Sequence, residues 1–87
     1  MEILKQAVCG TLLSNDCLLM IGPGQGHIKI EIESSVKESF GDQIEKVIKE
    51  KLQELGVTSC NLSINDKGAL DYAIKARVEV VVNRSNE

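Results

Sequence analysis

The apolar residues change their spacing near Ser34, and this change limits the possible folds more than any other feature of the sequence. Between Ile28 and Ile32, isoleucines alternate with charged residues, which is the period of a strand with one buried face. After Ser34, apolar residues recur at steps of three and four, as on one side of a helix. These positions are Val36, Phe40, Ile44, Val47, Ile48, Leu52 and Leu55. A half-buried strand followed by a one-sided helix predicts a domain in which helices cover a sheet.

Local signals predict where two helices begin. Ser35 and Glu38 have capping-box spacing at the start of the first helix. Residues 65–68 predict a turn in which Asp66 caps the next element. The second helix starts near Ala69 and carries on one side Leu70, Ala73, Ile74, Arg77, Val78 and Val81. The β-branched run 78–82 also suits a strand; we favour helix because no turn signal intervenes, and we expect residues 83–87 to form a frayed tail.

Three further runs predict strands: residues 7–13, 17–21 and 57–64. Gly10 interrupts the first run and indicates a bulge or a close backbone approach. The glycine-rich loop 22–26 predicts that the strands before and after it pair antiparallel. The sequence therefore predicts one α+β domain over residues 1–87, an antiparallel or mixed sheet of three to four strands with two helices packed on one face.

Composition excludes several classes of protein. Phe40 and Tyr72 are the only aromatic residues and the net charge is −3, so we do not expect a nucleic-acid binder, which would need more aromatic residues for base stacking and a basic surface. Three cysteines without CxxC spacing predict neither a disulfide framework nor a zinc site, and they fit a reducing cytoplasm. The start lacks a signal-peptide pattern, and no apolar run reaches the length of a membrane span.

Ser14 is the best-placed candidate for function. It lies among small and polar residues between two apolar runs, and no histidine or lysine stands beside it to activate it as a nucleophile. Such a serine suits the attachment of a group, although a plain turn serine has the same local pattern. His27 has no converging partners, and the loop 22–26 leads into a strand, whereas phosphate-binding loops lead into a helix. Arg77 is placed to pair with Asp71 or Asp66, or to contact a phosphate.

Four segments resemble the acyl carrier subunit of citrate lyase, its small gamma chain. In order along the chain they are Gly10–Asp16, Phe40–Ile44, Asp66–Asp71 and Ala76–Arg77. The resemblance extends over nearly the whole chain, and the Asp66–Asp71 segment is its most specific part. Asn15 departs from the glycine or serine that is common in the family at this position.

The resemblance implies that Ser14 carries a covalent prosthetic group, phosphoribosyl-dephospho-coenzyme A (phosphoribosyl-dephospho-CoA), through a phosphodiester. The working thiol then belongs to this group and carries acetyl and citryl thioesters. Gly10 and Asn15 would keep the loop uncrowded, and Asp16 would position the serine or the modifying enzyme. The docking candidates are Asp66, Lys67, Asp71 and Arg77. No residue of the chain itself is expected to be catalytic or to bind a metal.

The same resemblance implies the partners. They are the alpha subunit, which transfers acyl groups, the beta subunit, which cleaves the citryl thioester, the prosthetic-group transferase and an acetylating ligase. The net reaction would convert citrate to acetate and oxaloacetate. Two alternatives stay open: the related carrier subunit of malonate decarboxylase, and a small interaction domain that is never modified.

Overall fold

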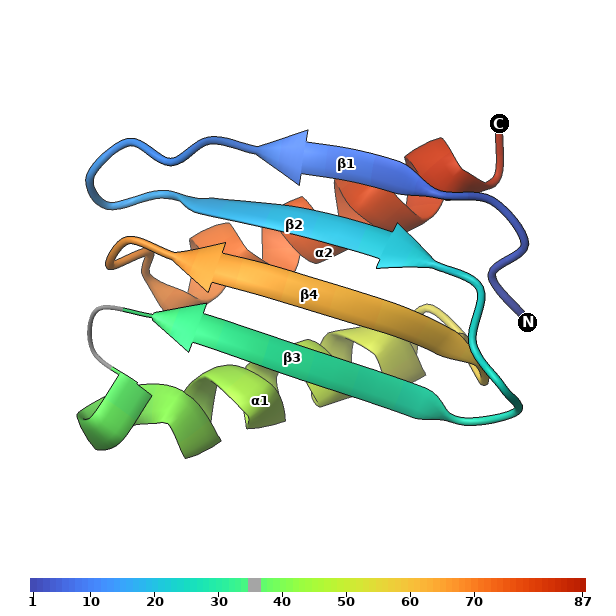
Figure 1. Ribbon diagram of the computed structural model, residues 1–87, viewed down its shortest axis with the longest axis horizontal. Coiled ribbons are helices and arrows are strands. Elements are labelled where there is room, and N and C mark those ends of the chain that lie inside the picture. Colours follow the sequence, from blue (N-terminus) through green and yellow to red (C-terminus); the bar gives the residue numbers. More distant parts are fainter. Residues whose placement is uncertain (35–36) are drawn as a thin grey trace.

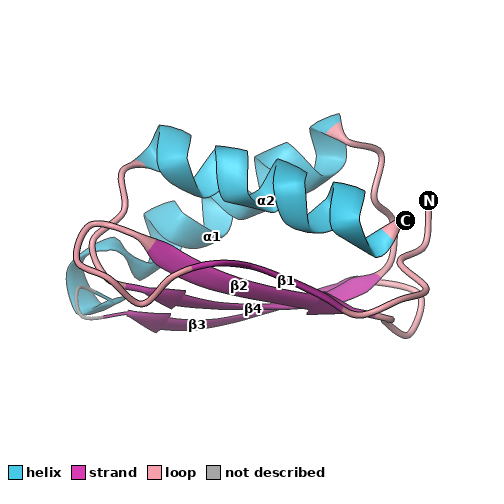
Figure 2. Ribbon diagram, turned by 90° about the horizontal axis from the view of Figure 1, so that it is seen from above, coloured by secondary structure: helices cyan, strands magenta, loops and turns pink. Residues whose placement is uncertain are grey.

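The computed structural model describes residues 1–34 and 37–87, which form a four-stranded sheet with two helices on one of its faces (Figures 1 and 2). The predicted α+β fold is confirmed. Along the chain, the elements are β1 (Ala7–Gly10), β2 (Cys17–Gly22), β3 (Ile28–Ser34), α1 (Lys37–Glu54), β4 (Cys60–Asp66) and α2 (Asp71–Ser85).

The strand order is β1-β2-β4-β3, so the predicted pairing of β2 with β3 is wrong. β4 lies between them, antiparallel to β2 and parallel to β3. The glycine-rich loop crosses the start of β4: a β-carbon at Gly24 would lie 2.6 Å from the Cys60 nitrogen. Asn61 Nδ2 donates to the Pro23 carbonyl at 3.1 Å. The glycines and Pro23 predicted the loop correctly, but they carry no information on which strand pairs with which. The connection through α1 makes β3 and β4 parallel neighbours.

The core lies between the sheet and the helices. α2 packs on β1 and β2, while α1 packs beside β3. The first helix buries Ile44, Val47, Ile48 and Leu52, and the second buries Ile74, Val78, Val81 and Val82. Leu62 and Ile64 share the buried face of β4, as their alternation predicts. β4 itself begins at Cys60 and ends at Asp66, three residues later than expected at its start and two at its end.

Two residues of the predicted apolar sides are exposed. Phe40 and Leu70 keep 56% and 61% of their surface accessible, because they line a groove beside the beginnings of the helices instead of facing the sheet. The predicted capping box lies outside the described residues in part, since Ser35 is not described and neither is the side chain of Glu38.

The prediction of a frayed tail over residues 83–87 is wrong for residues 83–85, which are helical, while Asn86 and Glu87 lie beyond the helix. α2 runs without interruption through 78–82 to Ser85, which settles the helix-or-strand alternative in favour of helix. Ser85 is buried and its hydroxyl donates to the Val82 carbonyl at 2.7 Å. Arg84 Nη1 donates to the Val8 carbonyl at 2.8 Å and ties the helix end to β1.

Candidate functional site

The loop between β1 and β2, residues 11–16, carries Ser14 at one end of the sheet; we call it the serine loop (Figure 1). β1 ends at Gly10 and does not continue to residue 13 as predicted. Gly10 has φ +101°, and a β-carbon there would lie 1.9 Å from the Cys17 carbonyl oxygen. The predicted close approach is therefore real: only glycine lets the two strands come together here, and Thr11 N then donates to that same carbonyl at 3.1 Å.

Ser14 lies at the corner of a β-turn. Asp16 N donates to the Leu13 carbonyl at 3.2 Å, so Ser14 and Asn15 are the two central residues. Asn15 has φ 65°, a value that type II turns require at this position and that asparagine and glycine tolerate best. The Ser14 side chain is exposed, and within the described part of the chain its hydroxyl has no hydrogen-bond partner.

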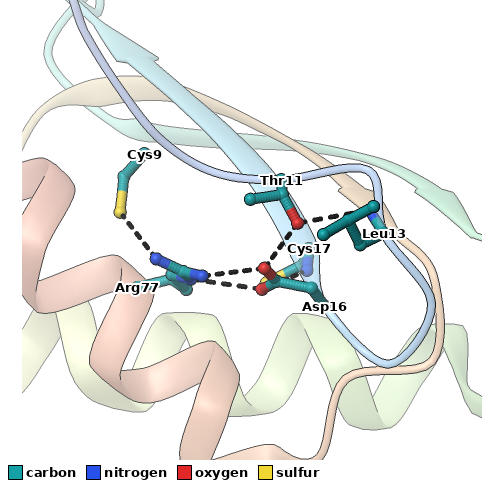
Figure 3. A network of polar contacts seen from close by, with 6 residues as sticks. All are labelled: Cys9, Thr11, Leu13, Asp16, Cys17 and Arg77. Atoms are coloured by element: carbon teal, nitrogen blue, oxygen red, sulfur yellow. Dashed lines mark hydrogen bonds and ion pairs between the residues drawn. The ribbon is translucent and has the colours of Figure 1, made fainter.

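Asp16 holds the serine loop in place through both of its carboxylate oxygens (Figure 3). Oδ2 accepts from Thr11 Oγ1 at 2.6 Å and from Arg77 Nη2 at 2.7 Å. Oδ1 accepts from Cys17 N at 2.8 Å and from Arg77 Nε at 3.2 Å. The hydrogen bonds from Arg77 and then Thr11 lower the pKa of Asp16 to about 2. Because all its acceptor positions are used, Asp16 braces the loop and does not act as a base for Ser14.

Arg77 pairs with Asp16, not with Asp71 or Asp66 as the sequence suggested. Its Nη1 also points at Cys9 Sγ, 3.9 Å away, and the bond to Asp16 raises the pKa of Arg77. The two partners are 61 residues apart, so no local pattern could reveal the pair. A usable signal existed: a cation on the buried side of a helix, next to Ile74 and Val78, needs a carboxylate partner.

The loop after β4 adds a second brace. Asn15 N donates to the Lys67 carbonyl at 2.8 Å, and Lys67 N donates to the Asp16 carbonyl at 2.9 Å. These bonds extend the pairing of β2 with β4 as far as the serine turn. The Lys67 side chain stays exposed.

Asp66, one of the docking candidates from the sequence, is buried and serves the fold. It is 1% exposed, and its carboxylate accepts from Ser34 Oγ at 3.0 Å and from Ala69 N at 2.9 Å. Its carboxylate therefore holds the loop before α2. It does not cap the first turn of the helix, which the sequence had predicted. Asp71 is exposed and accepts a hydrogen bond from Gln43 Nε2 at 3.1 Å.

The other candidate groups are poorly placed for chemistry. The three cysteines are free and buried, as expected of small apolar side chains. Burial raises the pKa of Cys17 to about 12 and also raises the pKa of Cys60. His27 is exposed, with Nδ1 3.4 Å from the Gln25 carbonyl. Across residues 1–34 and 37–87, no three potential ligand side chains gather as a metal site, and no helix is long and apolar enough to cross a membrane.

Comparison with known proteins gives a consistent set of relatives. A protein-family model described as "Malonate decarboxylase delta subunit (MdcD)" matches residues 4–85. A Treponema denticola protein named citrate lyase acyl carrier protein is 51% identical over 87 residues, which cover 100% of this chain and 99% of the relative. A Lactobacillus acidophilus protein of the same name is also 51% identical and is covered over 90% of its length.

A solved structure shares the fold. A chain in the crystal structure of a Pseudomonas malonate decarboxylase hetero-tetramer in complex with malonate superimposes with a TM-score of 0.81. The match covers 98% of this chain and 88% of that chain, at 18% identity. At this identity the likeness supports the architecture alone.

Proposed function

The chain belongs to the family of citrate lyase acyl carrier proteins, and we propose that it carries acyl groups on a prosthetic group attached to Ser14. Its relatives are named acyl carrier proteins, and it is a carrier subunit and not itself a catalyst. A carrier of this kind acts within a multi-subunit complex. What it contributes is the position of the attachment point and the surface that its partners recognise.

One observation supports attachment at Ser14. The serine stands exposed at the corner of a turn with its hydroxyl unbonded among the described residues, while the turn around it is held by Asp16 and Arg77. A reacting enzyme can therefore reach the oxygen without breaking a hydrogen bond of the fold. The nearest carboxylate has no free acceptor position, so the base that removes the serine proton must come from the modifying enzyme.

We propose phosphoribosyl-dephospho-CoA as the group attached to Ser14. Ser14 Oγ forms the new oxygen–phosphorus bond of a phosphodiester, its proton passes to the modifying enzyme, and a polyphosphate leaving group departs from the activated donor. When bound, the group supplies a thiol that carries acyl groups as thioesters. The cysteines of the chain cannot replace this thiol, since all three are buried and out of reach of an acyl donor.

Citrate is the substrate that we assign to the complex, cleaved to acetate and oxaloacetate. Relatives 40–51% identical over the whole chain carry the citrate lyase name, whereas the malonate decarboxylase structure is 18% identical. The proposed partners are the alpha and beta subunits of citrate lyase, the prosthetic-group transferase and an acetylating ligase. The cytoplasm is the proposed compartment, because it keeps the three free cysteines reduced.

The test is the intact mass of the chain after co-expression with the prosthetic-group transferase. We expect a mass gain of one phosphoribosyl-dephospho-CoA, located on Ser14 by peptide mapping. Ser14→Ala abolishes the gain, and Ser63→Ala, a serine on β4, keeps it. Alkylation of the native protein gives a second readout: one reactive thiol in the modified chain and none in the unmodified chain.

The opposite result is equally clear. An unmodified mass, with the same transferase shown to modify another carrier, contradicts the proposal and favours an interaction domain that is never modified. With a loaded chain, supplying the citrate lyase subunits yields oxaloacetate from citrate. Turnover of malonate instead, with malonate decarboxylase subunits, would move the assignment to the other complex.

A further inference from the structure

A groove of about 580 Å³ lies between the beginning of α1 and the loop that leads into α2. Its apolar lining includes Phe40, Leu70 and Tyr72, which are 56%, 61% and 73% exposed. Phe40 and Tyr72 are the two aromatic residues of the whole chain, and they reach this groove from different helices. A ligand that covers these three side chains removes a large apolar surface from contact with water. Their concentration in one groove therefore suggests a binding site.

The groove begins beside the serine turn. Gly68 is part of its lining, and a β-carbon at Gly68 would lie 3.6 Å from Asn15 Oδ1. The residue before it, Lys67, bonds through its backbone to Asn15 and Asp16. A group attached to Ser14 is therefore tethered next to the groove, at an effective concentration in the millimolar range.

The polar lining selects against anions. Asp66 and Asp71 contribute carboxylates, and Gln43 Nε2 donates to Asp71 Oδ2 at 3.1 Å. Among the side chains that the structure describes, no lysine or arginine lines the groove. Phosphate groups are repelled from such a surface. A flat, uncharged ring with an amino group is favoured, because its faces pack on aromatic side chains and the amine donates to a carboxylate.

We propose that this groove binds the adenine base of the prosthetic group, an inference that rests on the attachment proposed for Ser14. Adenine is flat and uncharged at neutral pH, it stacks on aromatic rings, and its amino group matches the carboxylate of Asp71. The phosphates of the same group remain in solvent. The groove thus holds the arm near the carrier between visits to partner subunits, and it fixes the direction in which the arm leaves Ser14.

Tyr72 and Phe40 make the proposal measurable, because each is the single residue of its type. In the modified chain, checked by intact mass, we expect a loss of Tyr72 fluorescence and upfield shifts of both rings in NMR spectra. Free dephospho-coenzyme A titrated into the unmodified chain should shift the same resonances at millimolar concentration. Leu70→Asp removes both effects without loss of folding, since aspartate is a favoured residue where α2 begins.

Leu4→Asp is the matched control, since Leu4 is 75% exposed and does not line the groove; it keeps both effects. If the Tyr72 and Phe40 signals of the modified chain equal those of the unmodified chain, the proposed adenine site is wrong, while the attachment to Ser14 stands. Shifts that arise only when a partner subunit is added overturn the adenine site too, because the groove is then a protein contact. If no mass is gained but dephospho-coenzyme A still shifts the two rings, the attachment fails and the groove stands.

Discussion

Two loops lie at opposite ends of β2, and they are held by different forces. The serine loop, residues 11–16, is braced by an ion pair between Asp16 and Arg77 as well as by backbone hydrogen bonds to Lys67. The glycine-rich loop, residues 22–26, is held by contact with the start of β4: Gly24 touches the backbone there, and Gly26 N donates to Ser59 Oγ at 3.0 Å. No charged group takes part in these contacts of the glycine-rich loop.

The difference shows how a small domain can display a residue without losing order. The glycine-rich loop is held through its backbone at Gly24, which is half-buried against the start of β4, while the side chains on either side of Gly24 are exposed. The serine loop is held by a charged pair in addition to backbone hydrogen bonds, and the side chain at its tip stays free. Ser14 lies at this tip, with the brace two residues away at Asp16. The loop with the stronger turn signal in sequence is therefore architectural, and the inconspicuous one carries the candidate site.

Alanine substitutions of the two close-contact glycines should give the largest effects. At Gly10, the added carbon meets a carbonyl oxygen at 1.9 Å and the backbone has φ +101°, so we expect a loss of unfolding free energy on the order of 4 kcal/mol. At Gly24 the nearest atom is 2.6 Å away and the backbone is not left-handed, so the loss should be about 1–3 kcal/mol. Urea unfolding measures both, and equal losses would contradict the ranking.

The sequence predicted what short-range patterns encode. Alternation at residues 28–32 and the three- and four-residue steps of α1 gave the elements, and Gly10 indicated a close approach that the backbone confirms. The sequence did not reveal which strands are neighbours, because β4 enters the sheet through a crossover of more than twenty residues. The partner of Arg77 was missed for the same reason: it lies 61 residues away.

Removal of the Arg77 charge should weaken the serine loop alone. Arg77→Met keeps most of the side-chain volume but leaves Asp16 without its bidentate partner, and we expect a loss of about 1–3 kcal/mol in unfolding free energy. Lys75→Met, an exposed change on the same helix, should cost less than about 0.5 kcal/mol. Hydrogen exchange of Asn15 N–H should speed up in Arg77→Met while that of Gly26 N–H stays constant. Acceleration at both ends would mean that the loops are not held independently.

Low pH should weaken the serine loop but not the glycine-rich loop in the wild-type protein. The pKa of Asp16 falls from 3.8 to about 2 on folding, so its charged form stabilises the fold above pH 3.8, and this contribution is lost as the pH falls towards 2. Hydrogen-exchange protection at Asn15 and Lys67 should therefore drop over this range while protection at Gly26 persists. In Asp16→Asn the serine loop should show weak protection at every pH. A wild-type serine loop that keeps its protection near pH 2 would show that the charge is not what braces it.

The smallest effect should come from Asn15→Gly, which tests whether the turn geometry or the side chain matters at the tip. Its φ of 65° is accessible to glycine without strain, so Asn15→Gly should change the unfolding free energy by less than about 0.5 kcal/mol. Asn15→Val places a β-branched residue in a left-handed conformation and should cost about 1–3 kcal/mol. Gln25→Val in the glycine-rich loop, exposed and without positive φ, is the control and should be nearly neutral. Since only the backbone of Asn15 is needed to turn the chain at Ser14, Asn15→Gly should also keep the rate at which the transferase modifies the serine. A large fall in that rate with stability unchanged would mean that the transferase reads the Asn15 side chain directly, and that the brace at Asp16 is not sufficient to present the site.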